Sequence, residues 1–241
     1  MSEQTGFRAD LGRAARAWSL EPKIVAISAA LGLVASAPDP WSWLLLPAFL
    51  FSIGWQGTQL MFYLRAYRGL PILSGELWRF TWSFLGRFFV LGLVASMPLL
   101  AALVTYVLVT GRTDAAATIL TFGGAAVTAA VIFLQPPLAY STRRVSIAVW
   151  LGFRALRRTW PASAWYALVP AILNLAAVTF ALRATDWWRI LIPGGVAVLN
   201  LWLAGAIAAL YLRLHEIGDD GAAHAPHGER LDPRSEPRPD A

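Results

Sequence analysis

Six long apolar stretches recur along this chain, and the arginines between them fall on alternate connections. The stretches cover residues 23–37, 41–64, 88–109, 115–140, 162–182 and 190–212. Most of them approach the roughly 20 residues that an α-helix needs to cross a bilayer. None alternates like a barrel strand, and a helix satisfies its own backbone hydrogen bonds in lipid. The pattern predicts an all-α membrane protein with six transmembrane helices.

The distribution of basic residues predicts how the chain is threaded. Seventeen of the 20 Lys and Arg residues lie in the N-terminal segment, after the second and fourth stretches, or after the sixth. The other connections hold only Arg112, Arg183 and Arg189. Because short cytoplasmic segments are rich in Lys and Arg, both termini are expected in the cytoplasm. Arg greatly outnumbers Lys and Ala is abundant, which indicates a GC-rich bacterial genome. We therefore expect the membrane to be a bacterial cytoplasmic membrane.

Three parts follow from this map. Residues 1–22 are expected to form a cytoplasmic amphipathic segment, 23–212 the six-helix transmembrane domain, and 213–241 a disordered cytoplasmic tail rich in charge and proline. The sequence Ala35-Ser36-Ala37 resembles a signal-peptidase site. Because Pro38 follows it, we expect no cleavage; cleavage would leave five spans with the same orientation.

A basic amphipathic segment precedes each of three predicted hairpins. Polar side chains share one helical face in each segment: Asp10, Arg13 and Arg16; Glu76, Arg79, Ser83 and Arg87; Arg154, Arg157 and Arg158. Apolar and aromatic residues cover the remainder, as in helices that lie in the headgroup plane. We therefore predict interfacial helices at about 76–87 and 145–160, and a threefold pseudo-repeat. A general preference for basic, Trp-rich leaders before inward-starting spans would also explain the charges.

The third segment carries a resemblance to known proteins. Residues 153–160, Phe-Arg-Ala-Leu-Arg-Arg-Thr-Trp, resemble the Ala-Leu-Arg-Arg-Ser-Trp segment of a group of bacterial six-span proteins. That group includes the membrane domain of glycerophosphoryl diester phosphodiesterases and its stand-alone, uncharacterised relatives. Here Phe153 replaces a common acidic residue and Pro161 a polar turn. The resemblance covers the layout of residues 10–212 and implies a stand-alone membrane module accessory to lipid or envelope metabolism. It carries over no catalytic residue.

Residue sets typical of catalysis are missing from the sequence. The chain has no cysteine, so it has no disulfide, thiolate nucleophile or Cys-ligated metal. It lacks the motifs of zinc proteases, serine hydrolases and P-loop nucleotide-binding proteins. Acidic residues and histidines lie outside the predicted membrane interior, which disfavours a proton-coupled transporter. We expect no enzyme activity, no cofactor and no metal. His224, His227 and Glu229 have a possible ligand spacing, but the composition around them favours disorder.

The polar side chains within the predicted spans are uncharged. They are Gln56, Gln59, Gln135, Asn174 and Asn200. Gln56 and Gln59 lie three residues apart and share a helix face. Hydrogen bonds between helices, worth about 0.6 kcal/mol each, would explain such residues. The alternative is a polar groove for a lipid headgroup or small solute, formed by Gln56, Gln59 and Asn174.

These features predict a non-enzymatic plasma-membrane protein that acts as an accessory or scaffold module. Its predicted contacts to anionic lipid headgroups, or to a membrane or cytoplasmic protein partner, are Arg79, Arg87, Arg154, Arg157 and Arg158. The basic charge lies next to the predicted spans, so it indicates topology and anionic lipid rather than nucleic acid. The alternative is a permease-type transporter subunit for a lipid or hydrophobic solute, working with a separate ATPase.

Overall fold

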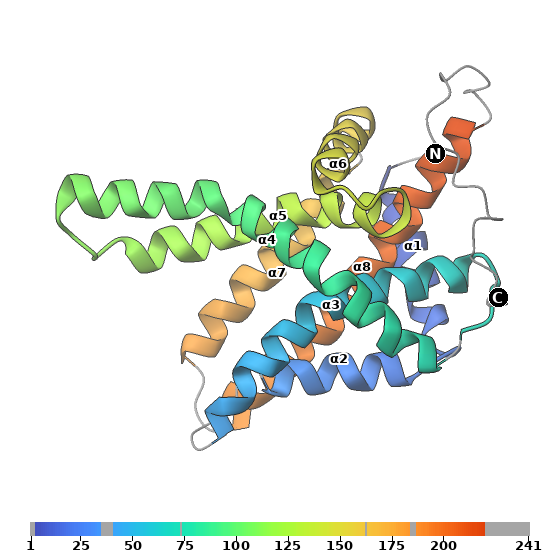
Figure 1. Cartoon of the computed structure of the whole chain (residues 1–241), viewed down its shortest axis with the longest axis horizontal. Helices are drawn as coiled ribbons and strands as arrows, with labels where there is room; N and C mark the ends of the chain where they lie inside the picture. Colours follow the sequence, from blue (N-terminus) through green and yellow to red (C-terminus); the bar gives the residue numbers. More distant parts are fainter. Residues whose placement is uncertain (1–2, 35–40, 73, 162, 184–186, 220–241) are drawn as a thin grey trace, which may run out of the picture.

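The computed structural model describes residues 3–34, 41–72, 74–161, 163–183 and 187–219, and within them the chain is helical with no strand (Figure 1). The elements are α1 (Glu3–Ala17), α2 (Lys23–Val34), the 3-10 helix η1 (Trp41–Leu44), α3 (Leu45–Tyr67), α4 (Ser74–Thr110), α5 (Ala116–Tyr140), α6 (Val145–Thr159), α7 (Ala164–Arg183) and α8 (Trp187–Asp219). The predicted all-α fold is confirmed.

Three of the described helices are long and apolar enough to cross a membrane. They are α4, the Thr118–Tyr140 part of α5 and the Ile190–Leu214 part of α8. Two apolar helices are shorter, Lys23–Val34 and the Ala164–Ala177 part of α7. The 12 residues of α2 extend about 18 Å, less than the roughly 30 Å hydrocarbon core. Length and composition therefore support a membrane protein, and the six-span count stays a prediction.

Two predicted boundaries differ from the structure. The separate interfacial helix at 76–87 is the first part of the continuous helix α4, because no proline interrupts the chain before Pro98. The last predicted span ends at 212, but α8 continues to Asp219, so the predicted tail begins too early. At the start of this added part, Arg213 contacts Asp10 of α1. Residues 220–241 and the segment 35–37 lie outside the described residues.

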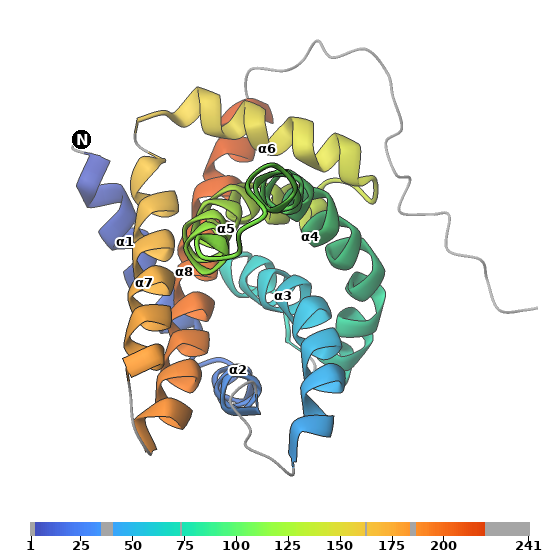
Figure 2. The same cartoon turned by 90° about the vertical axis from the view of Figure 1, so that its left-hand side faces the viewer.

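The helices pack in a cyclic order. α3 packs on α4, α5 on α7 and α8 on α2, while α3, α5 and α8 also contact one another. Figure 2 shows these three helices innermost, with α2, α4 and α7 around them. α4 pairs with α5 and α7 with α8, but α2 contacts α8 far more than α3. Of the three predicted hairpins, the first is therefore an open pair.

Each basic segment packs closely on one of the three inner helices. α1 packs on α8, the first part of α4 on α3, and α6 on α5. Glycine permits each approach: a Cβ at Gly205 would overlap Ala14, one at Gly54 the Thr81 carbonyl, and one at Gly152 the backbone of α5. These segments are thus tied to the bundle by backbone-to-backbone packing.

The main hydrophobic core lies where α1, α3, the first part of α4 and α8 meet. Its largest fully buried side chains include Tyr63, Phe62, Leu91 and Leu201. The outer parts of α4 and α5 form a hairpin that extends beyond the other helices (Figure 1) and is mostly exposed. Apolar side chains on such an exposed hairpin suit contact with lipid rather than water.

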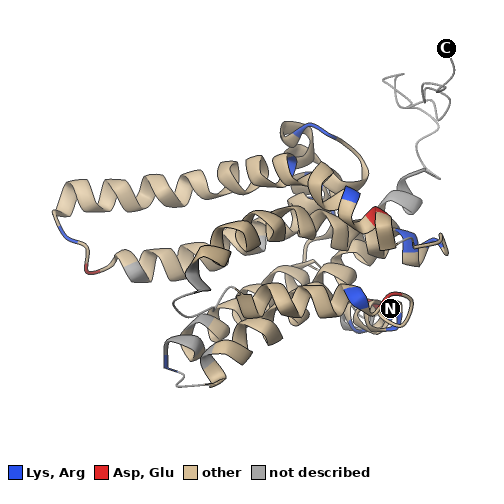
Figure 3. Cartoon of the chain, turned by 60° about the horizontal axis from the view of Figure 1, so that its bottom comes forward, with Lys and Arg blue, Asp and Glu red and all other residues tan. Residues whose placement is uncertain are grey.

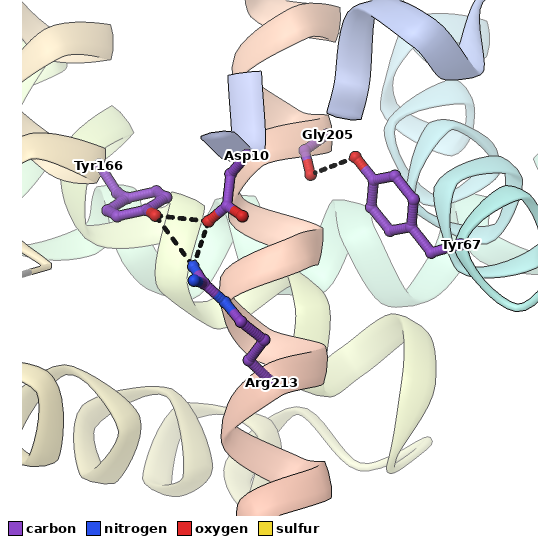
Figure 4. A network of polar contacts seen from close by, with 5 residues as sticks. All are labelled: Asp10, Tyr67, Tyr166, Gly205 and Arg213. Atoms are coloured by element: carbon purple, nitrogen blue, oxygen red, sulfur yellow. Dashed lines mark hydrogen bonds and ion pairs between the residues drawn. The ribbon is translucent and has the colours of Figure 1, made fainter. Parts of the chain in front are cut away.

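One residue of the predicted polar face of α1 is buried instead. Asp10 is 1% exposed and accepts hydrogen bonds from the Tyr166 hydroxyl at 2.6 Å and from the Arg213 guanidinium (Figure 4). Arg13 and Arg16 are exposed, as predicted. A buried carboxylate needs such partners, so Asp10 turns this face of α1 toward α7 and α8.

Candidate functional site

Charged residues are unevenly distributed over the molecule. Figure 3 shows most Lys and Arg gathered toward the end that holds the N-terminus, with a few at the opposite tips. Arg112 lies at one of these tips, between α4 and α5, and Arg183 ends α7. Between the two ends the ribbons carry almost no charge in the described chain. A protein with this distribution presents one strongly basic face and an uncharged middle.

The first part of α4 carries two of the five predicted contact arginines. Arg79 is exposed, and Arg87 is half-buried with its guanidinium 4.9 Å from the centre of the Phe84 ring. Trp78 and Trp82 are exposed on the same segment, and their rings contact each other edge to face. Cationic and aromatic side chains thus lie side by side on this segment, as in helices at a membrane interface.

Helix α6 carries the other three predicted arginines. Arg154, Arg157 and Arg158 are exposed, and the Arg154 guanidinium lies 5.2 Å from the Trp150 ring centre. Trp150 and Phe153 are more than half exposed. α6 packs mainly on α5 and leaves the rest of its surface open. Both arginine segments therefore combine exposed arginines with exposed aromatic rings.

Two of the three predicted groove residues line cavities between the helices. A first cavity of about 490 Å³ lies between α3, α4, α5 and α8, and a second of about 440 Å³ lies between α2, α3 and α8. Gln56 and Gln59 line both cavities. Volumes of this size are usual for small-molecule sites. Gln56 and Gln59 thus lie on the walls of two adjoining cavities, and a groove for a lipid headgroup or small solute stays a prediction.

Side-chain amides and hydroxyls connect the helices around these cavities. Gln135 Nε2 donates a hydrogen bond to Gln56 Oε1 at 2.7 Å, which joins α5 to α3. Ser28 Oγ accepts from Gln59 Nε2 at 3.0 Å and from Trp55 Nε1 at 2.9 Å, which joins α3 to α2. The hydrogen bonds expected between helices are present, and they occur on the walls of the cavities.

Asn174 does not line either cavity. Its amide pairs reciprocally with that of Asn200 across α7 and α8, at 3.1 and 3.3 Å, and it also donates to the Pro170 carbonyl at 2.8 Å. Its partner Asn200, rather than Asn174 itself, lines both cavities. The sequence placed Asn174 in a span but gave no sign of which helix it faces.

Sequence reasoning missed several polar lining residues. Ser28, Ser96 and Thr128 contribute to the cavity walls, but each hydroxyl donates to a carbonyl in its own helix, so each looks like an ordinary helical residue in sequence. The network of Asp10, Tyr166 and Arg213 was also missed. Its sequence signal is the small-residue stripe of Ala14 and Ala17 on the face of Asp10, which favours close helix packing.

The described walls of both cavities combine apolar side chains with uncharged amides and hydroxyls. Within the part of the chain that the structure describes, no charged side chain, histidine or cysteine lines either cavity. Among the described residues, no three His, Asp or Glu side chains come together as metal ligands would. Amides and hydroxyls can donate and accept hydrogen bonds, but at neutral pH they do not exchange protons as general acids or bases do.

Comparisons with protein-family models, with curated proteins and with solved structures find no match to this chain.

Proposed function

We propose that this chain is a non-enzymatic protein of the bacterial cytoplasmic membrane that binds anionic lipid headgroups at its cytoplasmic face. The observation that carries the proposal is the pairing of exposed arginines with exposed aromatic rings on two segments, the first part of α4 and α6. Guanidinium groups bind phosphate through several N–H donors, and indole rings favour the headgroup region. Such a surface fits an accessory or scaffold role.

The proposed topology has six spans: α2, α3, the outer part of α4, α5, α7 and α8. The start of α1 and the end of α8 then lie on the cytoplasmic side, at the end where most basic residues gather in Figure 3. The uncharged middle of the described chain supports a membrane-spanning arrangement, and the excess of basic residues at one end supports the orientation. The resemblance to the phosphodiesterase-associated membrane domain stays a prediction.

The proposed threefold repeat is supported by equivalent contacts. Arg65 at the end of α3 pairs with Glu76 of α4, and Arg213 near the end of α8 pairs with Asp10 of α1. In both cases an inner helix pairs with the basic segment that packs on it. The spacing Gly-x5-Tyr-Leu-Arg also occurs at both 57–65 and 205–213. Two of the three proposed units thus share residues as well as layout.

Tyrosine hydrogen bonds follow the same cyclic order. The Tyr63 hydroxyl of α3 donates to the Leu201 carbonyl of α8 at 2.9 Å, and that of Tyr140 of α5 donates to the Leu60 carbonyl of α3 at 2.6 Å. The hydroxyl of Tyr211 of α8 shares a hydrogen bond of 2.9 Å with Ser141, directly after α5. Each inner helix is thus bonded to the inner helix of the unit before it.

Lipid binding by purified protein tests the proposed function. We expect short-chain phosphatidylglycerol to bind more tightly than phosphatidylcholine, and less tightly as salt increases. A basic residue near an anionic surface contributes about 1 kcal/mol. The joint change of Arg79, Arg87, Arg154, Arg157 and Arg158 to Gln should therefore weaken phosphatidylglycerol binding by roughly tenfold or more.

A matched control comes from the opposite end of the molecule. Changing Arg112 and Arg183 to Gln should leave phosphatidylglycerol binding by the detergent-purified protein nearly unchanged. Equal affinity of the five-arginine variant and the unmodified protein at low salt would contradict the proposal. Loss of a co-purifying protein without loss of lipid binding would instead assign the arginines to a protein partner.

A permease-type subunit for a lipid or hydrophobic solute is the second candidate. The specific observation that favours it is the pair of adjoining cavities in the uncharged part of the molecule. ATP-dependent movement of a fluorescent lipid in membrane vesicles, lost when this chain is removed, would support transport. No such movement in vesicles that contain the chain together with every ATPase it co-purifies with would remove this candidate.

A further inference from the structure

The two cavities meet at a polar junction. Four residues line both of them: Phe49, Gln56, Gln59 and Asn200. Gln56 lies 11 residues after the start of α3, which has 23 residues, so the junction is about 17 Å from the helix start and near its midpoint. In the proposed topology, this position falls deep within the hydrocarbon core rather than at either headgroup layer.

Hydrogen-bonding capacity remains unused at this junction. The hydrogen bond between Gln135 and Gln56 uses the Gln135 nitrogen and the Gln56 oxygen, and the Gln59 nitrogen donates to Ser28. No described residue bonds to the Gln56 nitrogen, the Gln135 oxygen or the Gln59 oxygen. Unpaired amides are costly in hydrocarbon, where water is scarce. The junction can therefore donate to and accept from a bound molecule.

The walls on both sides of the junction are mainly apolar. Ile53, Phe88, Leu91 and Val131 are part of the first cavity. Leu31, Leu45, Ala48 and Ala197 are part of the second. A charged headgroup would find no partner of opposite charge there, and burying it alone would be very costly. The lining favours an uncharged molecule with a hydrogen-bonding group between two hydrocarbon arms.

We propose that the two adjoining cavities together bind a neutral lipid of the diacylglycerol type. Its hydroxyl and ester groups hydrogen-bond to Gln56, Gln59 and Gln135, and its acyl chains occupy the two cavities. Such a lipid carries no charge and lies deeper in the bilayer than a phospholipid headgroup. This site is separate from the arginines of the first part of α4 and of α6, and its occupancy does not require binding at them.

The test is photo-crosslinking of purified protein in phosphatidylcholine nanodiscs with a diacylglycerol that carries a diazirine in one acyl chain. We expect crosslinks to peptides of α2, α3, α4, α5 or α8, the helices that line the two cavities. Unlabelled diacylglycerol should compete, and phosphatidylglycerol should not. The double variant Gln56→Leu and Gln59→Leu should lower the crosslinking yield by roughly tenfold, the effect of losing about 1.4 kcal/mol of binding.

Two further variants keep the test decisive. Thr179→Val also removes a polar group from a predicted span, but Thr179 is exposed and its hydroxyl bonds only within α7, so the yield should stay unchanged. Ser96→Phe fills the first cavity from α4 and should lower the yield even if the glutamine variant fails to fold.

Full labelling of either cavity variant, or crosslinks confined to other peptides, would overturn the proposal. The five-arginine variant should label normally, so the two proposals fail independently.

Discussion

At the residue scale, Asp10 shows how one carboxylate fixes the orientation of a whole helix. Tyr166 and Arg213 reach it from α7 and α8, so α1 is held at a defined rotation. The side chain of Arg213 is 37% exposed, whereas that of Asp10 is 2% exposed. The acid is therefore much more deeply desolvated than its cationic partner, and burial raises the pKa of Asp10 above its ordinary value of 3.8 despite these favourable contacts.

This shift predicts a pH dependence of stability. A raised pKa means that the folded protein binds this proton more tightly than the unfolded chain does. The contribution of Asp10 to the free energy of unfolding is therefore largest below the ordinary pKa. It is lost as pH rises through the folded-state value. Between pH 7 and pH 4, the unfolding temperature of unmodified protein should therefore rise relative to that of Asp10→Asn, measured in detergent. The two proteins have all other carboxylates in common. If their unfolding temperatures changed in parallel with pH, the prediction would be contradicted.

Individual residues also show where sequence reasoning succeeds and where it stops. Gln56 and Gln59 were expected to form hydrogen bonds between helices, with a polar groove as the alternative. Their spacing places both on one helix face, and both bond to another helix and line the cavities. Asn174 was grouped with them but lines neither of these two cavities, because periodicity gives the face on which a residue lies but not the helix that this face contacts. Asp10 was assigned to the solvent-exposed polar face because it is charged. Its partners Tyr166 and Arg213 lie more than 150 residues away in the sequence, so local sequence could not reveal them.

At the element scale, close packing of the basic segments depends on glycine. Gly205 of α8 lies against Ala14 of α1 and the Tyr63 ring of α3, both 2.6 Å from where a Cβ would be. Neither a small buried methyl group nor a buried aromatic ring can move away without shifting its helix. The contact should therefore be specific to glycine at this position and should decide whether α1 stays docked.

The substitution Gly205→Ala should destabilise the protein by about 1–3 kcal/mol through overpacking. Gly195 of the same helix has no neighbour where its Cβ would be, so Gly195→Ala should be neutral or slightly stabilising. Unfolding temperature measures the effect, and limited trypsin cleavage at Arg13 or Arg16 reports release of α1. Equal behaviour of the two variants would show that α1 does not depend on this contact.

Helix existence was easier to predict than helix limits. The apolar runs and the segment at 145–160 correspond to helices, because periodicity and composition are local properties. The continuity of α4 through residue 87 was missed, since a change from a polar stripe to an apolar run changes the surroundings of a helix but does not end it. The last turns of α8 were missed because a tail rich in charge and proline follows them in the sequence, and Arg213, where they begin, contacts Asp10 of α1.

At the scale of the whole molecule, the cyclic packing order could not be read from local sequence. It depends on contacts between distant helices, above all those of α2 with α8. The alternation of arginines does predict which connections lie on the same side of the membrane. The loop that joins α4 and α5 and the one that follows α3 lie at opposite ends of these helices. They therefore offer one labelling site for each side of the membrane.

Because the chain contains no cysteine, single-cysteine variants report topology without background labelling. Thr113, between α4 and α5, and Leu70, after α3, are both exposed. In intact cells, a membrane-impermeant maleimide should label Thr113→Cys but not Leu70→Cys, and permeabilised cells should label both. The physical reason is that Lys and Arg next to spans are retained in the cytoplasm. The opposite result would invert the orientation, placing the exposed arginines of α4 and α6 on the outer side and removing the basis for cytoplasmic lipid binding.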